Sequence, residues 1–346
     1  MMTFQICLAP LKGITDALFR TTFAEFFNGV DRAVAPFLST TSGPRIKPSL
    51  LKELLPENNR TVPVVPQVMS KRAENFLPLA MALRDLGYDT INWNLGCPAP
   101  MVAKKGRGSG LLSNPEAIER FLDKVLAVMP HRLSIKMRLG RHRVDEIFEL
   151  LPILDRYPLK EVIIHPRTGV QMYKGVPQLD IFEQCLARCR HPVVYNGDIV
   201  APESFNRLRH RFPGIHGWMI GRGAVSDPFL CSALKGQVVD GGEKRLLFRQ
   251  FHDALYSRYA CKLYGPSHLL NRMKGLWSYF VKSIEEGRAL QKKINKARNV
   301  RHYEDVVDAF FDNDPKWTGL NDTLDSIGES TFENKPSSGK EDRDQS

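Results

Sequence analysis

The sequence predicts an α/β protein, a (β/α)8 TIM barrel followed by a small C-terminal helical bundle. Short apolar, β-branched segments alternate with amphipathic segments, and strand–helix alternation requires a parallel sheet. Eight such units within about 235 residues match the size of a barrel rather than that of a six-stranded open sheet. A doubly wound fold would place a GxGxxG turn after the first strand, where this chain has Ala9-Pro10-Leu11-Lys12-Gly13. The barrel is therefore the better prediction.

The individual elements follow from apolar periodicity and from the residues that begin and end helices. Ser113-Asn114-Pro115 is a typical helix start, and Gly87 is a typical helix end. The expected strands are Gln5–Ala9, Arg32–Pro36, Val62–Gln67, Thr90–Asn94, Leu133–Met137, Glu161–His165, Pro192–Asn196 and Gly217–Ile220. The expected helices are Ala17–Phe27, Ala73–Leu86, Pro115–Val128, Val144–Leu154, Gln178–Ala187, Pro202–Arg211 and Asp227–Leu234.

Beyond Gly241-Gly242 the strand signals stop and apolar residues recur at helical spacing. Gly265-Pro266 separates the first two stripes, and a third includes Val306, Val307 and Phe310. Three such stripes are most simply the core of a small helical bundle. We therefore expect a barrel domain over residues 1–240, a helical domain over 241–314, and a polar, acidic, disordered tail over 315–346.

The charge of the chain is concentrated in one segment. The 346 residues include 49 Lys and Arg against 38 Asp and Glu, a formal net charge of +11. Residues 1–242 carry a net charge of about +9, residues 243–303 about +10, and residues from 304 onward about −8. So dense a basic segment favours a polyanionic partner; a solvated helical surface is the alternative interpretation.

Export, membrane spanning and metal binding are not expected. No apolar run reaches roughly 18 residues, and the N-terminus has no basic segment followed by an apolar one. The six Cys form no CxxC pair, so neither a disulfide framework nor a zinc site is indicated. A reduced, cytoplasmic compartment and a monomeric chain are the expectations.

Polar residues gather where the expected strands end, which is where barrels form their active sites. Gln67, Asn94, Lys136 with Arg138, and His165 with Arg167 occupy such positions. The last two strands end in Asn196-Gly197-Asp198 and Gly221-Arg222-Gly223. Barrels commonly bind phosphate in these two loops; glycines let the backbone approach an anion, and Arg222 adds a fork-shaped donor.

These strand ends suit a flavin mononucleotide. Lys136 ends an apolar strand, where a charge is costly unless it meets an anion; a structural ion pair is the alternative to a cation beside an electron-rich ring. Gln67 and His165 can hydrogen-bond the polar edge of such a ring. Together with the phosphate loops, they predict FMN as the cofactor.

Cys97 follows a strand end and precedes Pro98. Most isolated cysteines are inert, buried side chains, and that interpretation stands beside a catalytic one. The segment after it, Lys104-Lys105-Gly106-Arg107-Gly108-Ser109-Gly110, has the composition of a lid over a polyanionic substrate. An ordinary flexible loop is the alternative.

In this order, the residues resemble the tRNA-dihydrouridine synthases, over residues 5–310. The most specific part is Asn94-Leu95-Gly96-Cys97-Pro98 with the glycine-rich segment that follows. The other matching segments are Leu8-Ala9-Pro10-Leu11-Lys12-Gly13-Ile14-Thr15-Asp16, Gln67-Val68, Lys136-Met137-Arg138-Leu139-Gly140, His165-Pro166-Arg167-Thr168, Asn196-Gly197-Asp198 and Met219-Ile220-Gly221-Arg222-Gly223.

The resemblance implies an FMN enzyme that reduces the C5–C6 bond of uridine in tRNA with NADPH as electron source. By the match, Cys97 is the acid that protonates C5, and Asn94 orients the uracil. The implied cofactor-binding residues are Pro10, Leu11, Lys12, Gln67, Lys136, His165, Asn196, Gly197, Asp198, Gly221 and Arg222. The residues expected to face RNA are Lys104, Lys105, Arg107, Arg138, Arg167, Arg272 and Lys274.

Two positions depart from the family's pattern. Many members carry Thr-Glu at the end of the second strand, where this chain has Ala35-Pro36-Phe37. Members often carry Asp two residues before Asn94, where this chain has Asn92, so a charge behind the site is missing.

Two alternative functions remain open. One is a flavin barrel that acts on a free pyrimidine, like dihydroorotate dehydrogenase, and the other is a non-catalytic RNA-binding protein on the same fold.

Overall fold

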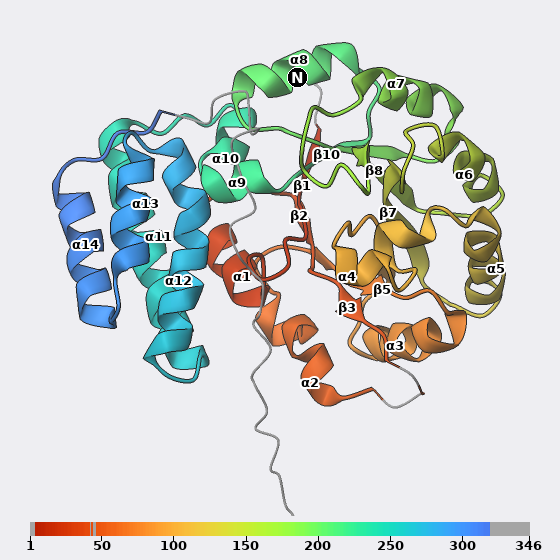
Figure 1. Cartoon of the computed structure of the whole chain (residues 1–346), viewed down its shortest axis with the longest axis horizontal. Coiled ribbons are helices and arrows are strands. Elements are labelled where there is room, and N and C mark those ends of the chain that lie inside the picture. The colour runs from red at the N-terminus through yellow and green to blue at the C-terminus, as the bar shows by residue number, and fades with distance from the viewer. Residues whose placement is uncertain (1–3, 42, 44–45, 319–346) are drawn as a thin grey trace, which may run out of the picture.

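The computed structural model describes residues 4–41, 43 and 46–318 (Figure 1). Its centre is one parallel sheet with the strand order β3-β5-β6-β7-β8-β9-β10-β1-β2-β4. The strands are β1 (Gln5–Leu8), β2 (Arg32–Val34), β3 (Leu38–Ser39), β4 (Val64–Val65), β5 (Gln67–Met69), β6 (Thr90–Leu95), β7 (Arg132–Gly140), β8 (Glu161–Thr168), β9 (Val193–Asn196) and β10 (Gly217–Ile220).

The predicted eight-stranded barrel is confirmed, with its second and third strands each divided in two. Pro66 separates β4 from β5, and Ala35-Pro36-Phe37 separates β2 from β3; proline has no N–H to donate to the ladder. The divided second strand (β2 and β3) pairs with the divided third strand (β4 and β5): β2 pairs with β4, and β3 pairs with β5. On their other sides β2 pairs with β1 and β5 pairs with β6. The sheet therefore closes on itself.

Helices surround the barrel, as expected for this fold (Figure 1). Stacking of the Trp93 and Phe121 rings, 3.8 Å between centroids, is one contact between the sheet and this layer. The longer helices are α1 (Ala17–Phe26), α3 (Ala73–Asp85), α5 (Pro115–Leu126), α6 (Ile147–Leu154), α7 (Leu179–Arg188) and α8 (Pro202–Arg211). The shorter ones are α2 (Pro48–Leu51), η1 (Lys52–Leu54), η2 (Pro56–Asn58), α4 (Pro100–Ala103), η3 (Gly108–Leu111), α9 (Arg222–Ser226) and α10 (Leu230–Leu234).

Two predicted helix starts were wrong. The helix predicted from Val144 begins at Ile147, because the Glu146 carboxylate accepts the backbone N–H groups of residues 141–143 and holds them in a turn. The helix predicted over Asp227–Leu234 begins only at Leu230, as α10, and α9 (Arg222–Ser226), which was not predicted, ends just before Asp227-Pro228. The residue before a proline is disfavoured in the helical region, so the chain breaks there.

In the part of the chain that the structure describes, four helices follow the barrel: α11 (Gly241–Lys262), α12 (Pro266–Phe280), α13 (Gly287–Lys296) and α14 (Val300–Asp312), with a short turn η4 (Val281–Ser283). Sequence periodicity predicted three of them. It missed α13, in which only Gly287 and Ile294 are buried, so the helix has almost no apolar stripe. The bundle lies beside α1, α9 and α10 (Figure 1), and Phe251 contacts Phe19 and Phe23 of α1 edge-on at 6.0 and 6.1 Å.

The chain after α14 returns to the bundle before the described residues end at 318. Lys316 O accepts a hydrogen bond from Glu285 N at 2.9 Å, and Trp317 packs against Phe248 with ring centroids 5.7 Å apart. The rest of the predicted acidic tail lies outside the described residues. Among the described helices, none combines the length and the apolar character that a membrane span requires.

Candidate functional site

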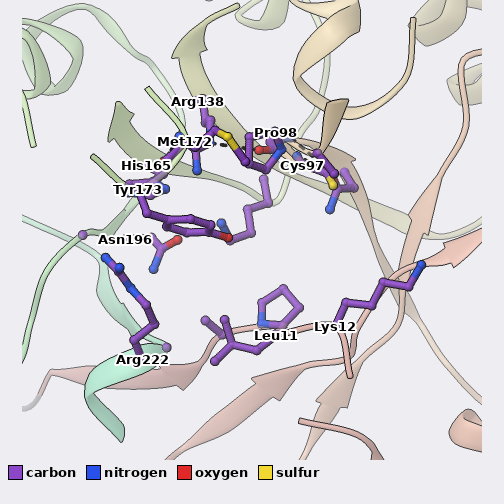
Figure 2. A pocket seen from close by; sticks show the side chains of 18 of the residues that line it. Leu11, Lys12, Cys97, Pro98, Arg138, His165, Met172, Tyr173, Asn196 and Arg222 are labelled. Carbon is purple, nitrogen blue, oxygen red and sulfur yellow. Dashed lines mark hydrogen bonds between the residues drawn. The ribbon is translucent and has the colours of Figure 1, made fainter. Parts of the chain in front are cut away.

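A cavity of about 330 Å³ opens at the carboxyl ends of the barrel strands. Figure 2 shows side chains that converge on it from the strand ends and the loops after them. Its wall contains Pro10, Leu11, Lys12, Asn94, Cys97, Lys136, Arg138, His165, Asn196, Gly197, Asp198, Gly221 and Arg222 from the predicted set. It also contains Phe37, Met172, Tyr173 and Tyr279. The volume lies in the range of small-molecule and cofactor pockets.

Two arginines and a tyrosine form one side of this cavity (Figure 2). The guanidinium carbon atoms of Arg138 and Arg222 lie 5.3 and 4.8 Å from the centre of the Tyr173 ring. The Asp198 carboxylate accepts hydrogen bonds from Arg222 at 2.7 Å and from Arg167 at 3.1 and 2.6 Å. Because one carboxylate faces two guanidinium groups, this corner keeps a net positive charge, which suits a phosphate.

The backbone of the two predicted phosphate loops leaves no room for side chains. A Cβ atom on Gly197 would lie 2.1 Å from the Tyr195 hydroxyl oxygen, and one on Gly223 would lie 2.1 Å from the Ile199 carbonyl oxygen. A Cβ on Gly221 would lie 3.2 Å from Ala9 Cβ. The glycines are therefore required by close packing beside Arg222. A tightly packed, positively charged loop pair fits the phosphate of a nucleotide cofactor.

Lys136 lies on β7 and is partly buried in the cavity wall. Burial, together with the smaller effect of the neighbouring Arg138, lowers the pKa of its ammonium from 10.5 to about 7. No hydrogen bond to another described residue satisfies this ammonium. A partly buried cation without a protein anion is suited to an anionic or electron-rich ligand. Of the two interpretations of Lys136 drawn from the sequence, this favours a cation beside an electron-rich ring over a structural ion pair.

His165 is neutral in this environment. Burial holds its pKa well below the usual value, and the charges of Arg138, Lys136 and Arg167 act in the same direction. A neutral imidazole has one donor and one acceptor nitrogen. His165 can therefore hydrogen-bond a ring edge without adding another positive charge.

The turn that carries Cys97 is held from two sides. The Asn94 carboxamide oxygen accepts the N–H groups of Gly96 and Cys97 at 3.1 and 2.9 Å. Ser109 N donates to Cys97 O at 3.0 Å, and Gly108, at φ +55°, approaches so closely that a Cβ would lie 2.8 Å from Cys97 O. The backbone around the thiol is therefore fixed.

Burial raises the pKa of the Cys97 thiol, more than Lys12, Arg138 and Lys136 lower it. The thiol is therefore protonated at neutral pH and can act as a proton donor.

The glycine-rich segment that was predicted to be a lid has one exposed part and one buried part. Lys104 and Lys105 are exposed and Arg107 is partly exposed, whereas Gly108 and Ser109 are buried beneath Cys97.

Gln67 is the predicted cofactor residue that the structure does not bring to the cavity wall. Its side chain is fully buried and exchanges hydrogen bonds with Asn92 at 2.8 Å and with Asn94 at 2.7 Å. Inward-facing side chains of a barrel lie in successive layers between the interior and the mouth, and the sequence alone does not place a carboxamide in one layer or the other.

Arg138 and Arg167, predicted to face substrate, differ in position. Arg138 lines the cavity, and its guanidinium also donates to Gly96 O, Thr168 O and Met172 O. The Arg167 side chain is 1% exposed and is held by Asp198 and by the carbonyl oxygen of Gly175. Arg167 therefore supports the positively charged corner of Asp198 and Arg222 from behind.

Arg272 and Lys274, predicted to bind RNA, both have partners within the chain. Arg272 donates to Gly13 O and forms an ion pair with Asp16 at 3.4 Å. Lys274 donates to the carbonyl oxygens of Asn295 and Ala297, at 3.0 and 2.6 Å, at the end of α13. Both side chains are partly exposed.

Sequence reasoning missed the two tyrosines of the cavity wall. Tyr173 lies in the loop after β8, a place where barrels put site residues, so its position was available as a signal. Tyr279 lies on α12, and nothing in the periodicity separates it from the bundle core. Because Tyr279 is part of the cavity wall, the bundle contributes directly to the cavity. The Tyr279 ring also lies 4.6 Å from the Lys282 ammonium.

The chain is similar to known proteins over most of its length. The family model described as dihydrouridine synthase (Dus) matches residues 7–313. The tRNA-dihydrouridine(16) synthase of Cupriavidus necator is 28% identical over 316 residues, which cover 88% of this chain and 96% of that protein. The probable tRNA-dihydrouridine synthase 2 of Bacillus subtilis is 29% identical over 273 residues, 75% of this chain and 81% of that protein.

Among solved structures, a 2-naphthoyl-CoA reductase complex superimposes with a TM-score of 0.52 at 11% identity. The match covers 67% of this chain and 50% of that one. At this identity the similarity concerns the fold alone, and it agrees with the closed parallel barrel described above.

Proposed function

Because this chain belongs to the dihydrouridine synthase family, we propose that it reduces specific uridines in tRNA to 5,6-dihydrouridine, with FMN as cofactor and NADPH as electron donor. The observation that carries the proposal is the cavity itself, in which a protonated thiol, a lysine without a protein anion and a positively charged phosphate corner meet at the barrel mouth. The barrel would carry out the chemistry, and the helical segment after residue 240 would bind RNA.

The cavity wall fits FMN in charge and in shape. Arg222 and the backbone at Gly197 and Gly221 would hold the phosphate. Asp198 would act through Arg222, because its carboxylate accepts that guanidinium. The remaining predicted cofactor residues on the wall, which would surround the ring system, are Pro10, Leu11, Lys12, Lys136, His165 and Asn196.

When bound, reduced flavin supplies a hydride to C6 of the base. The protein must then supply one proton to C5, which completes saturation of the C5–C6 bond. Cys97 would donate this proton from Sγ, and its raised pKa keeps the thiol loaded at neutral pH. A positioned general acid typically contributes about 10²- to 10⁴-fold to the rate. Solvent at the open mouth can return the proton to the thiolate.

The bundle offers the charge that an RNA backbone requires. Lys292, Lys293, Lys296 and Arg298 are exposed on or just after α13. A depression lined by Lys274, Lys296 and Arg298 lies between α12 and the end of α13. Because a stacked base must leave its stack to enter the cavity, at a cost of a few kcal/mol, phosphate contacts over this surface would offset that cost.

The proposal is tested by incubating the purified, FMN-loaded protein with NADPH and tRNA from cells that lack dihydrouridine. Nucleoside mass spectrometry should detect dihydrouridine with wild-type protein and almost none with Cys97→Ala, which should still bind FMN. Free uracil and uridine, tested in parallel, should not be reduced. Reduction of the free pyrimidine but not of tRNA would instead support the dihydroorotate dehydrogenase-like alternative. Failure to bind FMN would support the non-catalytic one.

A further inference from the structure

A hydrogen-bonded chain of three carboxamides and one hydroxyl begins at Asn94 and runs into the barrel interior. Gln67, Asn92 and Ser134 lie opposite one another on β5, β6 and β7, and all three are fully buried. Asn94 Nδ2 donates to Gln67 Oε1 at 2.7 Å, Gln67 Nε2 to Asn92 Oδ1 at 2.8 Å, and Asn92 Nδ2 to Ser134 Oγ at 2.9 Å.

The backbone fixes the direction of every bond in this chain. Asn94 Oδ1 accepts two N–H groups, those of Gly96 and Cys97, and a backbone N–H can only donate. The Asn94 amide nitrogen must therefore point at Gln67, which in turn fixes the orientations of Gln67 and Asn92. Only Ser134, whose hydroxyl can either donate or accept, ends the chain without a direction of its own.

As a result, Asn94 can offer only one kind of contact to a ligand in the cavity. Its carboxamide oxygen has two lone pairs, and both are used by the backbone. Its nitrogen has two hydrogens, and one is used by Gln67. Asn94 lies on the cavity wall, so the single group that remains for a ligand is an N–H donor.

We propose that Gln67, Asn92 and Ser134 are positioning residues that hold Asn94 in the orientation its backbone contacts require, with an N–H donor toward the cavity, so that the cavity selects the 4-carbonyl of uracil against the 4-amino group of cytosine. The inference rests on the proposed function and deepens it. A donor facing a carbonyl oxygen forms a hydrogen bond, whereas a donor facing an amino group leaves both groups unpaired. Sites built in this way reject the wrong group by at least about 100-fold.

The chain predicts different results for two substitutions at position 92. Asn92→Asp keeps an acceptor for Gln67, and the Ser134 hydroxyl can turn to donate to the carboxylate, so the direction of the chain is unchanged. Asn92→Leu has a similar volume but no acceptor, so the Gln67 amide loses the contact that orients it. Asn92→Asp is therefore the matched control, and Asn92→Leu is the test.

Asn94→Asp reverses the chain. The carboxylate cannot donate to Gln67, so the Gln67 amide turns and donates to it; Asn92 turns likewise, and Ser134 becomes the donor. Every buried group stays paired, so the variant should fold. It presents an acceptor to the cavity where wild-type protein presents a donor, so the preference for uracil should disappear.

The experiment uses tRNA transcripts that carry either uridine or cytidine at the position that the wild-type enzyme reduces. The rate at which prereduced, FMN-loaded protein is reoxidised by each transcript gives the discrimination. We expect a ratio of at least about 100 for wild type and Asn92→Asp. The ratio should fall at least about tenfold for Asn92→Leu and Ser134→Ala, with the Kd for tRNA unchanged, and should be lost in Asn94→Asp.

A second readout needs neither cofactor nor RNA. Loss of the chain loosens the Asn94 contacts to the Cys97 turn, so iodoacetamide should alkylate Cys97 at least about fivefold faster in flavin-free Asn92→Leu, but not in Asn92→Asp. If wild-type enzyme reduces uridine in tRNA but Asn92→Leu is unchanged in both readouts, the positioning role of the chain is wrong and the proposed function stands. A wild-type enzyme that leaves tRNA unreduced, with Cys97 alkylation faster only in Asn92→Leu, would overturn the function and leave the chain standing.

Discussion

Replacing Lys136 by methionine should make the flavin-free protein more stable. Burial lowers the pKa of this ammonium from 10.5 to about 7, which means that the folded state disfavours its charge. Each tenfold change in acidity corresponds to about 1.4 kcal/mol, so a change of this size amounts to roughly 5 kcal/mol. Because Lys136 is only partly buried and water in the cavity reaches its charge, we expect a measured gain of about 2–3 kcal/mol.

The sign of the pH dependence follows from proton linkage. Between pH 7 and the ordinary pKa near 10.5, the unfolded chain holds a proton on Lys136 that the folded chain has lost, so wild-type stability rises with pH in this window. Below pH 7 both states are protonated and the full penalty applies. The advantage of Lys136→Met should therefore be largest at about pH 6 and nearly absent at about pH 10.

Urea unfolding of flavin-free protein, followed by tryptophan fluorescence, measures this difference at several pH values. Lys52→Met, which replaces an exposed lysine, is the control and should change stability little. The same Lys136→Met protein should bind FMN at least about tenfold more weakly, because the cation that faces the cofactor is gone. A less stable Lys136→Met protein, or a gain that does not vary with pH, would refute the reasoning.

Three further substitutions test other parts of the site. Cys97→Ser should retain FMN but lose at least about 100-fold in uridine reduction, because a hydroxyl is a far weaker acid; near-normal turnover would remove Cys97 from the acid role. The double variant Arg272→Ala/Lys274→Ala should weaken tRNA binding and flatten its salt dependence, and an unchanged salt slope would place the RNA elsewhere. Gly197→Ala puts a Cβ 2.1 Å from the buried Tyr195 hydroxyl, so thermal melting should show about 1–3 kcal/mol of destabilisation and FMN titration weaker binding; unchanged values would contradict the packed loop.

Much of the barrel could be predicted because its signals are local. The strand Gly217–Ile220 and the helix Pro202–Arg211 begin and end where the sequence places them. The elements that could not be placed depend on single competing interactions. The helix expected from Asp227 begins only after Pro228, at Leu230, and the Glu146 carboxylate delays the start of α6. Helix α13 buries only Gly287 and Ile294, and Lys274 of α12 donates to carbonyl oxygens at its end.

The site residues likewise include some that the sequence could place and some that only the folded structure places. Strand-end position was enough to bring Lys136, Cys97 and Arg222 to one cavity. It could not show that Gln67 points into the barrel interior, because the layer of an inward side chain depends on the register between neighbouring strands. Nor could it show that Arg272 is tied to the loop after β1, since that contact joins segments about 260 residues apart and only the closed fold brings them together.

The most direct test of the proposed activity is the dihydrouridine content of tRNA in cells of the source organism. Deletion of the gene should remove dihydrouridine from one or more defined tRNA positions, as mapped by mass spectrometry of tRNA fragments. Expression of the wild-type chain should restore it, and expression of Cys97→Ala at equal abundance should not. Unchanged dihydrouridine at every position after deletion, or full restoration by Cys97→Ala, would contradict the proposed function or the role of the thiol, respectively.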